Sequence, residues 1–589
     1  MQNAETVLGV LRERGRRGLP CNQLYRQLFN PHLYLLAYGR LYSNQGAMTP
    51  GVDGETVDGM SQAKIGRIID AVRHERYRFR PVRRVYIPKK NGKRRPLGLP
   101  SWSDKLVSEV VRLLLEAYYE PTFSDRSHGF RPGKGCHTAL SEVATTWTGT
   151  TWLIESDIAQ CFDRLDHSVM LRTLGEKIHD NRFMRLLRNM LQAGYLEDWE
   201  WNATLSGAPQ GGVASPVLSN IYLDQLDKFV ETVLIPQYTR GERRKPNPAY
   251  MEVRKKLKRA RYRGDRAMAR QLRKQQRSLP SGDPYDPDYR RLRYARYADD
   301  QLLGFTGPKA EAEQIKAHLT AFLRDNLKLE LSQEKTLVTH ARTGAAKFLG
   351  YEITVQHADH RRSINGAVGL RVPTDVIKAK CAPYLKLGKP EARTRLVNED
   401  DHTIVETYGA QYRGLVNYYL LAGDVWRLNR LHWVMQTSLL KTLACKHDSS
   451  VSKMAARYTT TIDTRHGPRK CLQAAVEGTG RKPLTATFGG IPLKRQRKAV
   501  LTDRKPHPGV TRRTQLIQRL QAGRCEMCQH TGEVEAHHVG KLAHLRKPGQ
   551  PRPPWMELMA RKRQKTLVVC AACHSLIHDR RPTATPNTE

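Results

Sequence analysis

The chain has 589 residues, of which 39% are hydrophobic and 26% are charged, so it is neither disordered nor small enough for one hydrophobic core. Its formal net charge of +42 exceeds what solubility requires and indicates a polyanionic partner. Nucleic acid is the favoured partner, and a ribosome-associated or merely basic protein is the alternative.

The cellular compartment follows from two features of the sequence. No apolar run is long enough to span a bilayer, and the N-terminal residues lack the pattern of a secretory signal. We therefore expect a cytoplasmic protein that has no membrane partner and keeps its thiols reduced. Six of the ten cysteines stand singly, whereas four form two C-x-x-C pairs, which indicates a metal site rather than disulfides.

The N-terminal half predicts helices followed by short strands. Residues 1–80 should be helical with a turn at Thr49–Gly54, and the pattern changes to strands over Arg80–Leu99. Between Arg240 and Ser278, a helical stretch carries sixteen Lys or Arg residues against three acidic ones. Because the two signs are unbalanced, phosphate contact is favoured over a solvated surface helix.

The second half predicts further helices and strands. One face of an amphipathic helix is made of Ala312, Ile315, Leu319, Phe322 and Leu323. Leucines alternate over 327–331 as strand residues do, and Lys347–Ile353 predicts another strand. Residues 375–460 should be helical, whereas the basic stretch Arg481–Arg513 indicates a linker or a DNA-contacting arm.

Acidic residues stand at the ends of two expected strands. The short buried strand Thr151–Ile154 leads to Asp157, and Asp299 and Asp300 stand where the chain turns back into Leu302–Phe305. Phosphoryl transfer to a 3′-hydroxyl uses two divalent cations about 4 Å apart, and Mg²⁺ takes carboxylate oxygens as its protein ligands. Acids also crowd turns for backbone reasons, so the acidic pair alone does not decide between a metal site and a turn.

Six blocks around these acids occur in the order of a known family. They are Gly51-Val52-Asp53-Gly54, Ile87-Pro88-Lys89 through Arg95-Pro96-Leu97-Gly98-Leu99-Pro100, Ser127-His128-Gly129-Phe130-Arg131-Pro132-Gly133, Asp157-Ile158 through Cys161-Phe162-Asp163, Pro209-Gln210-Gly211-Gly212 through Ser215-Pro216, and Tyr297-Ala298-Asp299-Asp300. Over nearly its whole length the chain resembles a reverse transcriptase, specifically the proteins encoded by bacterial group II introns.

The resemblance implies roles for particular residues. Asp157, Asp299 and Asp300 are the implied Mg²⁺ ligands and catalytic residues. Phe162 matches the steric gate that excludes a ribose 2′-hydroxyl, the group by which proteins tell RNA from DNA, and a plain core aromatic is the alternative. The implied contacts to the incoming dNTP are Lys89, Arg95, Lys105 and Gln210.

Residues 375–460 resemble the polymerase thumb, which in this family is also the maturase domain that helps the intron RNA to splice. Gln411–Tyr419 and Lys441-Thr442-Leu443 carry this likeness. Tyrosines beside arginines suit RNA, because rings stack on bases and guanidinium groups hold phosphates. Aromatics at helical spacing are nevertheless more often core residues.

The tail of the chain predicts a structural zinc site. Cys525-x-x-Cys528 and Cys570-x-x-Cys573 supply four thiolates, which close a tetrahedral site and leave no open coordination position. The segment from about Gln521 onward is short and poor in apolar residues, so Zn²⁺ would stabilise its small core.

The histidines of the tail resemble those of an HNH nuclease, whose fold is a ββα finger around one metal ion. His537 and His578 are the implied ligands of a divalent ion such as Mg²⁺, with His574 as a further ligand. His538 is the implied general base. Lys565-Thr566-Leu567 stands where the family has an asparagine, which argues against vigorous cutting, and an inert zinc module that binds DNA is the alternative.

We therefore expect a multidomain α+β protein with right-hand polymerase fingers and palm, an antiparallel palm sheet, an α-helical thumb and a zinc-stabilised ββα-metal HNH domain. The expected divisions are 1–370 for fingers and palm with a basic insertion at about 236–295, 371–480 for the thumb or maturase domain, 481–519 for a basic DNA-binding linker, and 520–589 for the HNH endonuclease domain.

The expected function is that of an RNA-directed DNA polymerase that binds its group II intron RNA and assists splicing. It would nick target DNA and reverse-transcribe the intron from dNTPs in retrohoming. One alternative is a splicing cofactor with decayed polymerase and nuclease, against which the three intact carboxylates argue. The other is a different polymerase, such as a retron-type reverse transcriptase or an RNA-dependent RNA polymerase, against which Phe162 and the C-terminal nuclease pattern argue.

Overall fold

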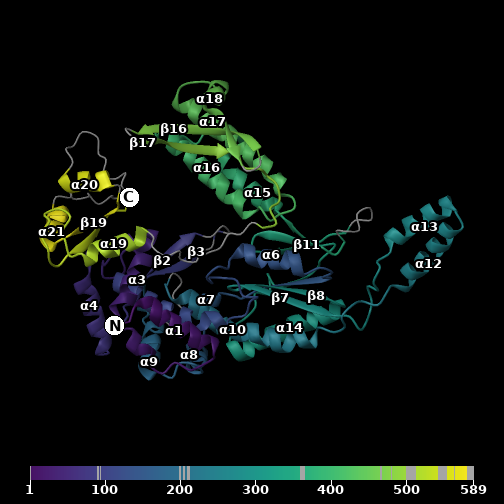
Figure 1. Ribbon diagram of the computed structural model, residues 1–589, viewed down its shortest axis with the longest axis horizontal. Coiled ribbons are helices and arrows are strands. Elements are labelled where there is room, and N and C mark those ends of the chain that lie inside the picture. Colours follow the sequence, from purple (N-terminus) through teal and green to yellow (C-terminus); the bar gives the residue numbers. More distant parts are fainter. Residues whose placement is uncertain are drawn as a thin grey trace.

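Figure 1 shows a large N-terminal body, a protruding pair of helices, and two further parts that lie above the body and beside its N-terminal helices. The computed structural model describes residues 2–589 except 89–91, 93, 198–199, 203–205, 208–211, 358–364, 465–466, 479–480, 499–511, 541–552, 563 and 580–589. Among the described residues, no helix combines the length and apolar character needed to cross a bilayer.

A four-stranded antiparallel sheet lies inside the body, with strand order β7-β8-β4-β9. Its strands are β7 (Arg291–Tyr297), β8 (Asp300–Thr306), β4 (Trp152–Asp157) and β9 (Leu337–His340). Alternate residues of a strand face opposite sides, so Ile154 and Leu303 join the cluster that contains α14, and Leu153 and Leu302 join the cluster that contains α6. Helices α14 (Lys309–Leu327) and α6 (Cys136–Thr146) thus cover the two faces.

The remainder of the body is mostly helical. Its main helices are α1 (Ala4–Arg16), α3 (Pro31–Leu41), α4 (Gln62–Arg73), α5 (Trp102–Tyr119), α8 (His167–Gly175), α9 (Asn181–Leu191) and α10 (Ser215–Phe229). A second sheet has the order β3-β2-β5-β6, with β2 (Val82–Pro88), β3 (Arg94–Leu99), β5 (Tyr195–Glu197) and β6 (Glu200–Asn202). The expected helices before residue 80 and strands after it are confirmed.

Two strand predictions in the body are wrong. The leucines over 327–331 form only one isolated bridge, Ile158 with Leu331, because α14 runs to Leu327 and Lys328 then takes a left-handed conformation. The stretch Lys347–Ile353 is a hairpin, β10 (Ala346–Phe348) and β11 (Tyr351–Val355), rather than one strand. Leu349 and Gly350, with φ of 48° and 72°, make the tight turn between them.

The part above the body contains the expected helices, α15 (Thr374–Cys381), α16 (Asp401–Tyr418), α17 (Asn429–Lys446) and α18 (Val451–Tyr458). It also contains an antiparallel sheet of β15 (Thr459–Thr464), β16 (Gly467–Gly478) and β17 (Arg481–Gly489). The expected linker therefore does not begin at residue 481. Ala486 and Phe488 are buried in the core of this part, and this alternation makes residues 481–489 a strand.

The C-terminal part packs on the body. Its elements are α19 (Arg512–Gln521), β18 (Glu535–His538), α20 (Pro554–Lys562), β19 (Thr566–Val569) and α21 (Ala571–Asp579). A two-residue strand of the body, β1 (Met60–Ser61), pairs with β18 and completes a three-stranded sheet. Buried residues of both parts belong to one continuous hydrophobic cluster.

A fully buried ion pair supports the hairpin between β7 and β8. Arg296 donates hydrogen bonds of 2.7 and 2.6 Å to the two carboxylate oxygens of Asp227, and both side chains are 0% exposed. We expect Asp227→Ala to lower the free energy of unfolding by about 3–5 kcal/mol, because it leaves a buried guanidinium unpaired. Urea denaturation will measure this loss. Asp325→Ala, which breaks an exposed pair with Arg324, should change stability little, and equal losses for both variants would contradict the prediction.

Candidate functional site

The structure brings together the three predicted carboxylates at one end of the antiparallel sheet. Asp157 is the last residue of β4 and pairs in register with Asp300, the first residue of β8. Asp299 belongs to the two-residue turn between β7 and β8, in which Ala298 has φ of 55°. Strand pairing therefore gathers acids from two distant segments of the sequence.

Residues of the Ser127–Gly133 block hold this turn in place. Arg296 donates to the carbonyl of Ala298 at 2.9 Å and to the hydroxyl of Ser127 at 2.8 Å. A side chain at Gly129 would lie 2.4 Å from the backbone nitrogen of Ala298, so only glycine fits this close approach. These supporting contacts were not predicted, although the block that supplies them was noted.

The carboxylates crowd one another electrostatically. Burial raises the pKa of Asp299, and the charge of Asp157 adds to this effect. Burial, together with the charges of Asp299 and Asp157, raises the pKa of Asp300 to about 7. Lys335, which was not predicted, donates to Asp157 at 2.8 Å, and this hydrogen bond raises its own pKa. Hard oxygen ligands that repel each other fit a divalent cation such as Mg²⁺.

The structure places the four residues predicted to contact the dNTP in different surroundings. The exposed Arg95, on β3, lies close enough for its charge to oppose part of the rise in the pKa of Asp299. The ammonium of Lys105 instead donates to the carbonyls of Gly46 and Thr49, at 3.1 and 3.0 Å, so the structure does not bring it to the carboxylates. Lys89 and Gln210 lie outside the described residues.

Phe162 is linked through aromatic contacts to the hairpin that carries Asp299 and Asp300. It belongs to α7 (Cys161–Arg164), directly after β4, and is only partly buried. Its ring centroid is 6.3 Å from that of Phe130, which is in turn 6.3 Å from that of Tyr297. A chain of aromatic rings thus connects Phe162 to the hairpin that carries the acids.

The four paired cysteines converge in the C-terminal part. Cys525, Cys528, Cys570 and Cys573 have sulfur atoms that all lie within 4.8 Å of one another. The Sγ atoms of Cys528 and Cys570 are 3.7 Å apart. A tetrahedral site with Zn–S bonds of about 2.3 Å has S···S edges of about 3.8 Å, so the geometry is compatible with zinc.

The structure separates the two adjacent histidines of the tail. His537, His574 and His578 form a second cluster, joined by Asp58 from the body, which was not predicted. His538 faces away from this cluster, and its Nε2 atom lies 2.8 Å from the hydroxyl of Tyr38. His538 is 3% exposed, and burial lowers its pKa to about 4. In this arrangement it is not free to act as a general base.

Aromatic residues of the helical part are divided between core and surface. Tyr412 and Tyr419 are buried, as the core interpretation predicts. Trp426 and Trp433 are 62% and 58% exposed, so their rings are available to stack on bases.

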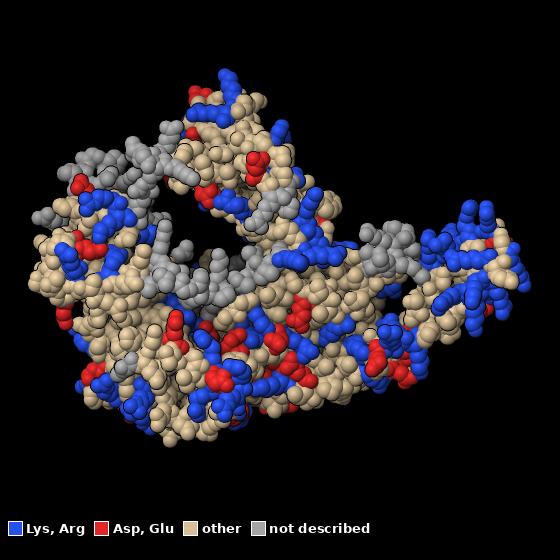
Figure 2. Space-filling model, in the orientation of Figure 1, with Lys and Arg blue, Asp and Glu red and all other residues tan. Residues whose placement is uncertain are grey.

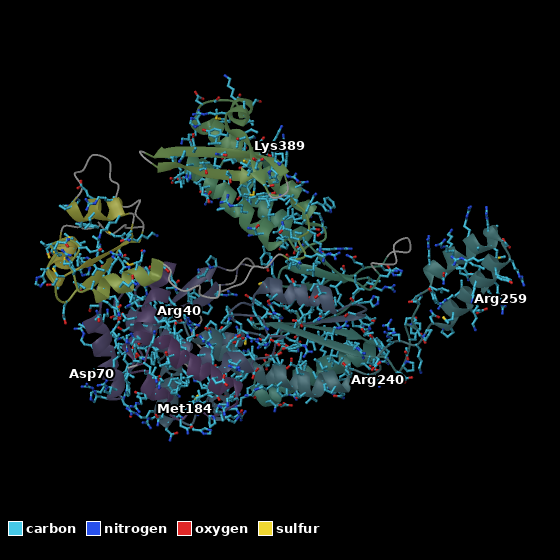
Figure 3. All side chains as sticks on the ribbon, in the orientation of Figure 1. Arg40, Asp70, Met184, Arg240, Arg259 and Lys389 are labelled. Carbon is cyan, nitrogen blue, oxygen red and sulfur yellow. The ribbon has the colours of Figure 1, made fainter. Side chains whose placement is uncertain are left out.

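Basic side chains cover the protruding helices α12 (Pro248–Tyr262) and α13 (Arg266–Ser278), as Figure 2 shows. The two helices carry eleven Lys or Arg residues, all exposed, against the single acid Glu252. Figure 3 labels Arg240 where this arm joins the body and Arg259 on α12. The helical prediction for this stretch is confirmed.

These features define an enzyme that acts on nucleic acids, with a carboxylate centre suited to phosphoryl transfer and a separate Cys/His domain. Residues 87–244 match the family described as reverse transcriptase (RNA-dependent DNA polymerase). Residues 373–473 match the type II intron maturase family, and residues 525–574 match AI2M/AI1M-like HNH endonucleases.

The chain belongs to the group II intron-encoded proteins, with reverse transcriptase, maturase and HNH endonuclease domains. It is 37% identical over 579 residues to the group II intron-encoded protein LtrA of Lactococcus lactis subsp. cremoris, covering 94% of this chain and 95% of the relative. It is 30% identical to a putative COX1/OXI3 intron 1 protein of Saccharomyces cerevisiae, covering 95% and 69%. A solved telomerase structure from Candida albicans matches with a TM-score of 0.32 and 11% identity over 64% of this chain and 62% of that one, which is too weak to define the fold.

Proposed function

We propose that this protein assists the splicing of its own group II intron and mobilises it. It binds the intron RNA, nicks a DNA target with the HNH domain and extends the nicked strand with dNTPs, using the intron RNA as template. The observation that carries the proposal is the register of Asp157 with Asp300 beside Asp299, because a protein whose polymerase had decayed would not need to keep three mutually repelling acids.

The polymerase centre is proposed to use Asp157, Asp299 and Asp300 as Mg²⁺ ligands and catalytic residues. Its two metal ions would activate the primer 3′-oxygen and stabilise the leaving pyrophosphate. Phe162 would exclude ribonucleotides, and Arg95 would hold the triphosphate. Lys89 and Gln210 remain proposed dNTP contacts, whereas Lys105 is proposed to position the Gly46–Thr49 segment through its backbone bonds.

The architecture is proposed to be that of a right hand. The carboxylate sheet is the palm, the sheet β3-β2-β5-β6 with its helices forms the fingers, and α15–α18 with β15–β17 form the thumb and maturase domain. The body and this domain would end near residues 370 and 490, and a basic linker would lead to α19 and the HNH domain. Figure 2 shows an open space between the helical part, the C-terminal part and the body, where a template–primer duplex would lie.

The C-terminal domain is proposed to bind Zn²⁺ through Cys525, Cys528, Cys570 and Cys573. His537, His574 and His578 would hold a second divalent ion, and His538 would act as the general base when target DNA is bound. The compartment is proposed to be the cytoplasm.

The full reaction tests the proposal. Purified protein with its intron RNA, a DNA duplex of the target sequence, Mg²⁺ and dNTPs should produce a nicked strand that is extended into intron cDNA. Omitting the RNA should abolish extension. Nicking and extension that both fail on the cognate target, with splicing intact, would support the splicing-cofactor alternative instead.

The basic arm of α12 and α13 should contribute to RNA affinity through phosphate contacts. Replacing Arg270, Arg273, Lys274 and Arg277 by Gln should reduce the salt dependence of RNA binding, because each lost phosphate contact lowers the slope of log K against log salt by about 0.7–0.9. Filter binding between low and moderate salt will measure the slope. Replacing the same arginines by Lys keeps the charge and should leave the slope unchanged. An unaltered slope in the Gln variant would show that the arm does not contact RNA.

A further inference from the structure

Asp58 of the body lies against the histidine cluster of the C-terminal domain. Its Oδ1 atom is 3.3 Å from Nδ1 of His537 and 3.4 Å from Nε2 of His574. Its Oδ2 atom is 3.0 Å from Nε2 of His578. Nε2 of His574 is also 3.2 Å from both Nδ1 of His537 and Nε2 of His578. One aspartate oxygen or another therefore approaches every histidine of the cluster.

These separations are close to the edge lengths of a tetrahedral metal site. With metal–ligand bonds of about 2.0–2.1 Å, the edges of a tetrahedral site measure about 3.3–3.4 Å. Five separations lie between 3.0 and 3.4 Å, two of them to Oδ1 of Asp58 and one to Oδ2. One ligand atom from each of the four residues lies within 4.8 Å of the other three. Three imidazoles and a carboxylate form a donor set that suits Zn²⁺ and other divalent transition ions.

Backbone pairing between the two domains fixes Asp58 in this place. The amide of His538 donates to Oδ1 of Asp58 at 2.7 Å, and the amide of Gly59 donates to the carbonyl of Ala536 at 3.1 Å. Directly after Asp58, β1 pairs with β18. Glu535, on β18, lies 2.8 Å from Nδ1 of His574 and orients that ring, as residues behind metal ligands usually do.

The same contact surface covers His538. Its ring lies against Tyr38 and Tyr42 of the body, with centroid distances of 6.1 and 5.9 Å. Its Nε2 atom is hydrogen-bonded to the Tyr38 hydroxyl, which is itself buried. In the docked arrangement, Asp58 therefore occupies the fourth position of the histidine cluster. Tyr38 occupies Nε2 of His538, the nitrogen that a general base must present to water.

We propose that Asp58 is the fourth protein ligand of the HNH metal ion, and that docking on the body holds the nuclease in a closed form. A catalytic site of this kind has three protein ligands and keeps one position open for substrate, whereas a site with four protein ligands is closed. Cutting then requires that target DNA release Asp58 from the ion and His538 from Tyr38. The closed form rests on the proposed nuclease role, whereas the assignment of Asp58 as a ligand does not.

Cobalt binding tests the ligand assignment without any cleavage assay. Full-length protein with Zn²⁺ at the four cysteines is freed of loosely bound metal and titrated with Co²⁺, whose visible absorption is much stronger in tetrahedral sites. Asp58→Asn keeps the shape and the contact to the His538 amide but removes the charge. It should weaken the tetrahedral absorption and lower Co²⁺ affinity at least about tenfold.

The control for this experiment is Asp70→Asn. Asp70, labelled in Figure 3, lies on α4 near Asp58 in sequence. Its side chain is 55% exposed and pairs with Arg76. This variant should match the wild type in spectrum and affinity. Identical spectra and affinities for Asp58→Asn and the wild type would overturn the assignment.

Nicking of a supercoiled plasmid at saturating divalent metal tests the closed form. Asp58→Asn and Tyr38→Phe each remove one element of the closure, so both should nick at least about five times faster than the wild type. A rate at or below that of the wild type in both variants would overturn the closed form. Absence of nicking in every variant would reject the proposed nuclease together with the closed form, while the cobalt spectra would still decide on Asp58.

Discussion

Replacing Asp299 by Asn should reduce extension of a DNA primer on an RNA template by about three orders of magnitude or more. The substitution removes a carboxylate from a centre that would hold two divalent ions, and each ion contributes several kcal/mol of charge stabilisation in the transition state. The turn itself should survive, because Arg296 holds it through the carbonyl of Ala298 rather than through the Asp299 side chain. The loss should therefore appear in the rate of nucleotide addition under single-turnover conditions.

Two measurements make this result specific to the metal centre. Affinity for the intron RNA should stay within about twofold of the wild type, because the basic arm lies on α12 and α13, away from the carboxylate sheet (Figure 1). Asp325→Asn removes an exposed carboxylate from α14 and should leave extension unchanged. Extension by the Asp299→Asn protein at more than about a tenth of the wild-type rate would exclude the proposed catalytic role.

Removal of the proposed zinc ion should unfold the C-terminal domain and leave the polymerase active. Structural Zn²⁺ supplies about 10–16 kcal/mol of folding free energy in small domains, which exceeds what so short a segment obtains from its own core. Cys573→Ser should have the same effect, because Cys573 is buried at the start of α21 and its loss breaks the four-thiolate set. Amides of β18, β19 and α21 should then exchange with solvent at nearly the rate of an unfolded chain.

Hydrogen exchange with mass spectrometry will follow those amides before and after chelation. Cys445→Ser is the matched control, because Cys445 is exposed on α17 and belongs to neither cluster. Protection of the carboxylate sheet should remain unchanged in all variants. Full protection of β18 and β19 in the Cys573→Ser protein would show that packing against the body, rather than zinc, stabilises this domain.

Local patterns in the sequence were sufficient to predict much of both sites. Asp157 follows one predicted strand and the Asp299-Asp300 pair precedes another, and the antiparallel pairing of β4 with β8 places them at the same end of the sheet. The two C-x-x-C motifs place pairs of thiolates at metal-binding distance because their spacing is short. In both cases the structure brings the predicted residues together.

Other predictions from local patterns failed for identifiable reasons. Lys347–Ile353 has the composition of one strand, but a left-handed pair at Leu349 and Gly350 divides it into a hairpin. The stretch Arg481–Gly489 has the basic composition of a linker. Ala486 and Phe488, two residues apart, are nevertheless buried in the core that contains residues of α16 and β16. The composition of a segment does not reveal whether another part of the chain provides a surface against which its residues can be buried.

The sequence by itself determined the family resemblance, the acids beside predicted strands and the two cysteine pairs, because each depends on residue types in short local motifs. Only the tertiary structure decided the partners of those residues: Lys335 beside Asp157, Asp227 beneath Arg296, and Asp58 among the histidines of the last domain. These contacts join segments that are far apart in the chain. They arise from the packing of whole sheets and helices, which no local spacing encodes.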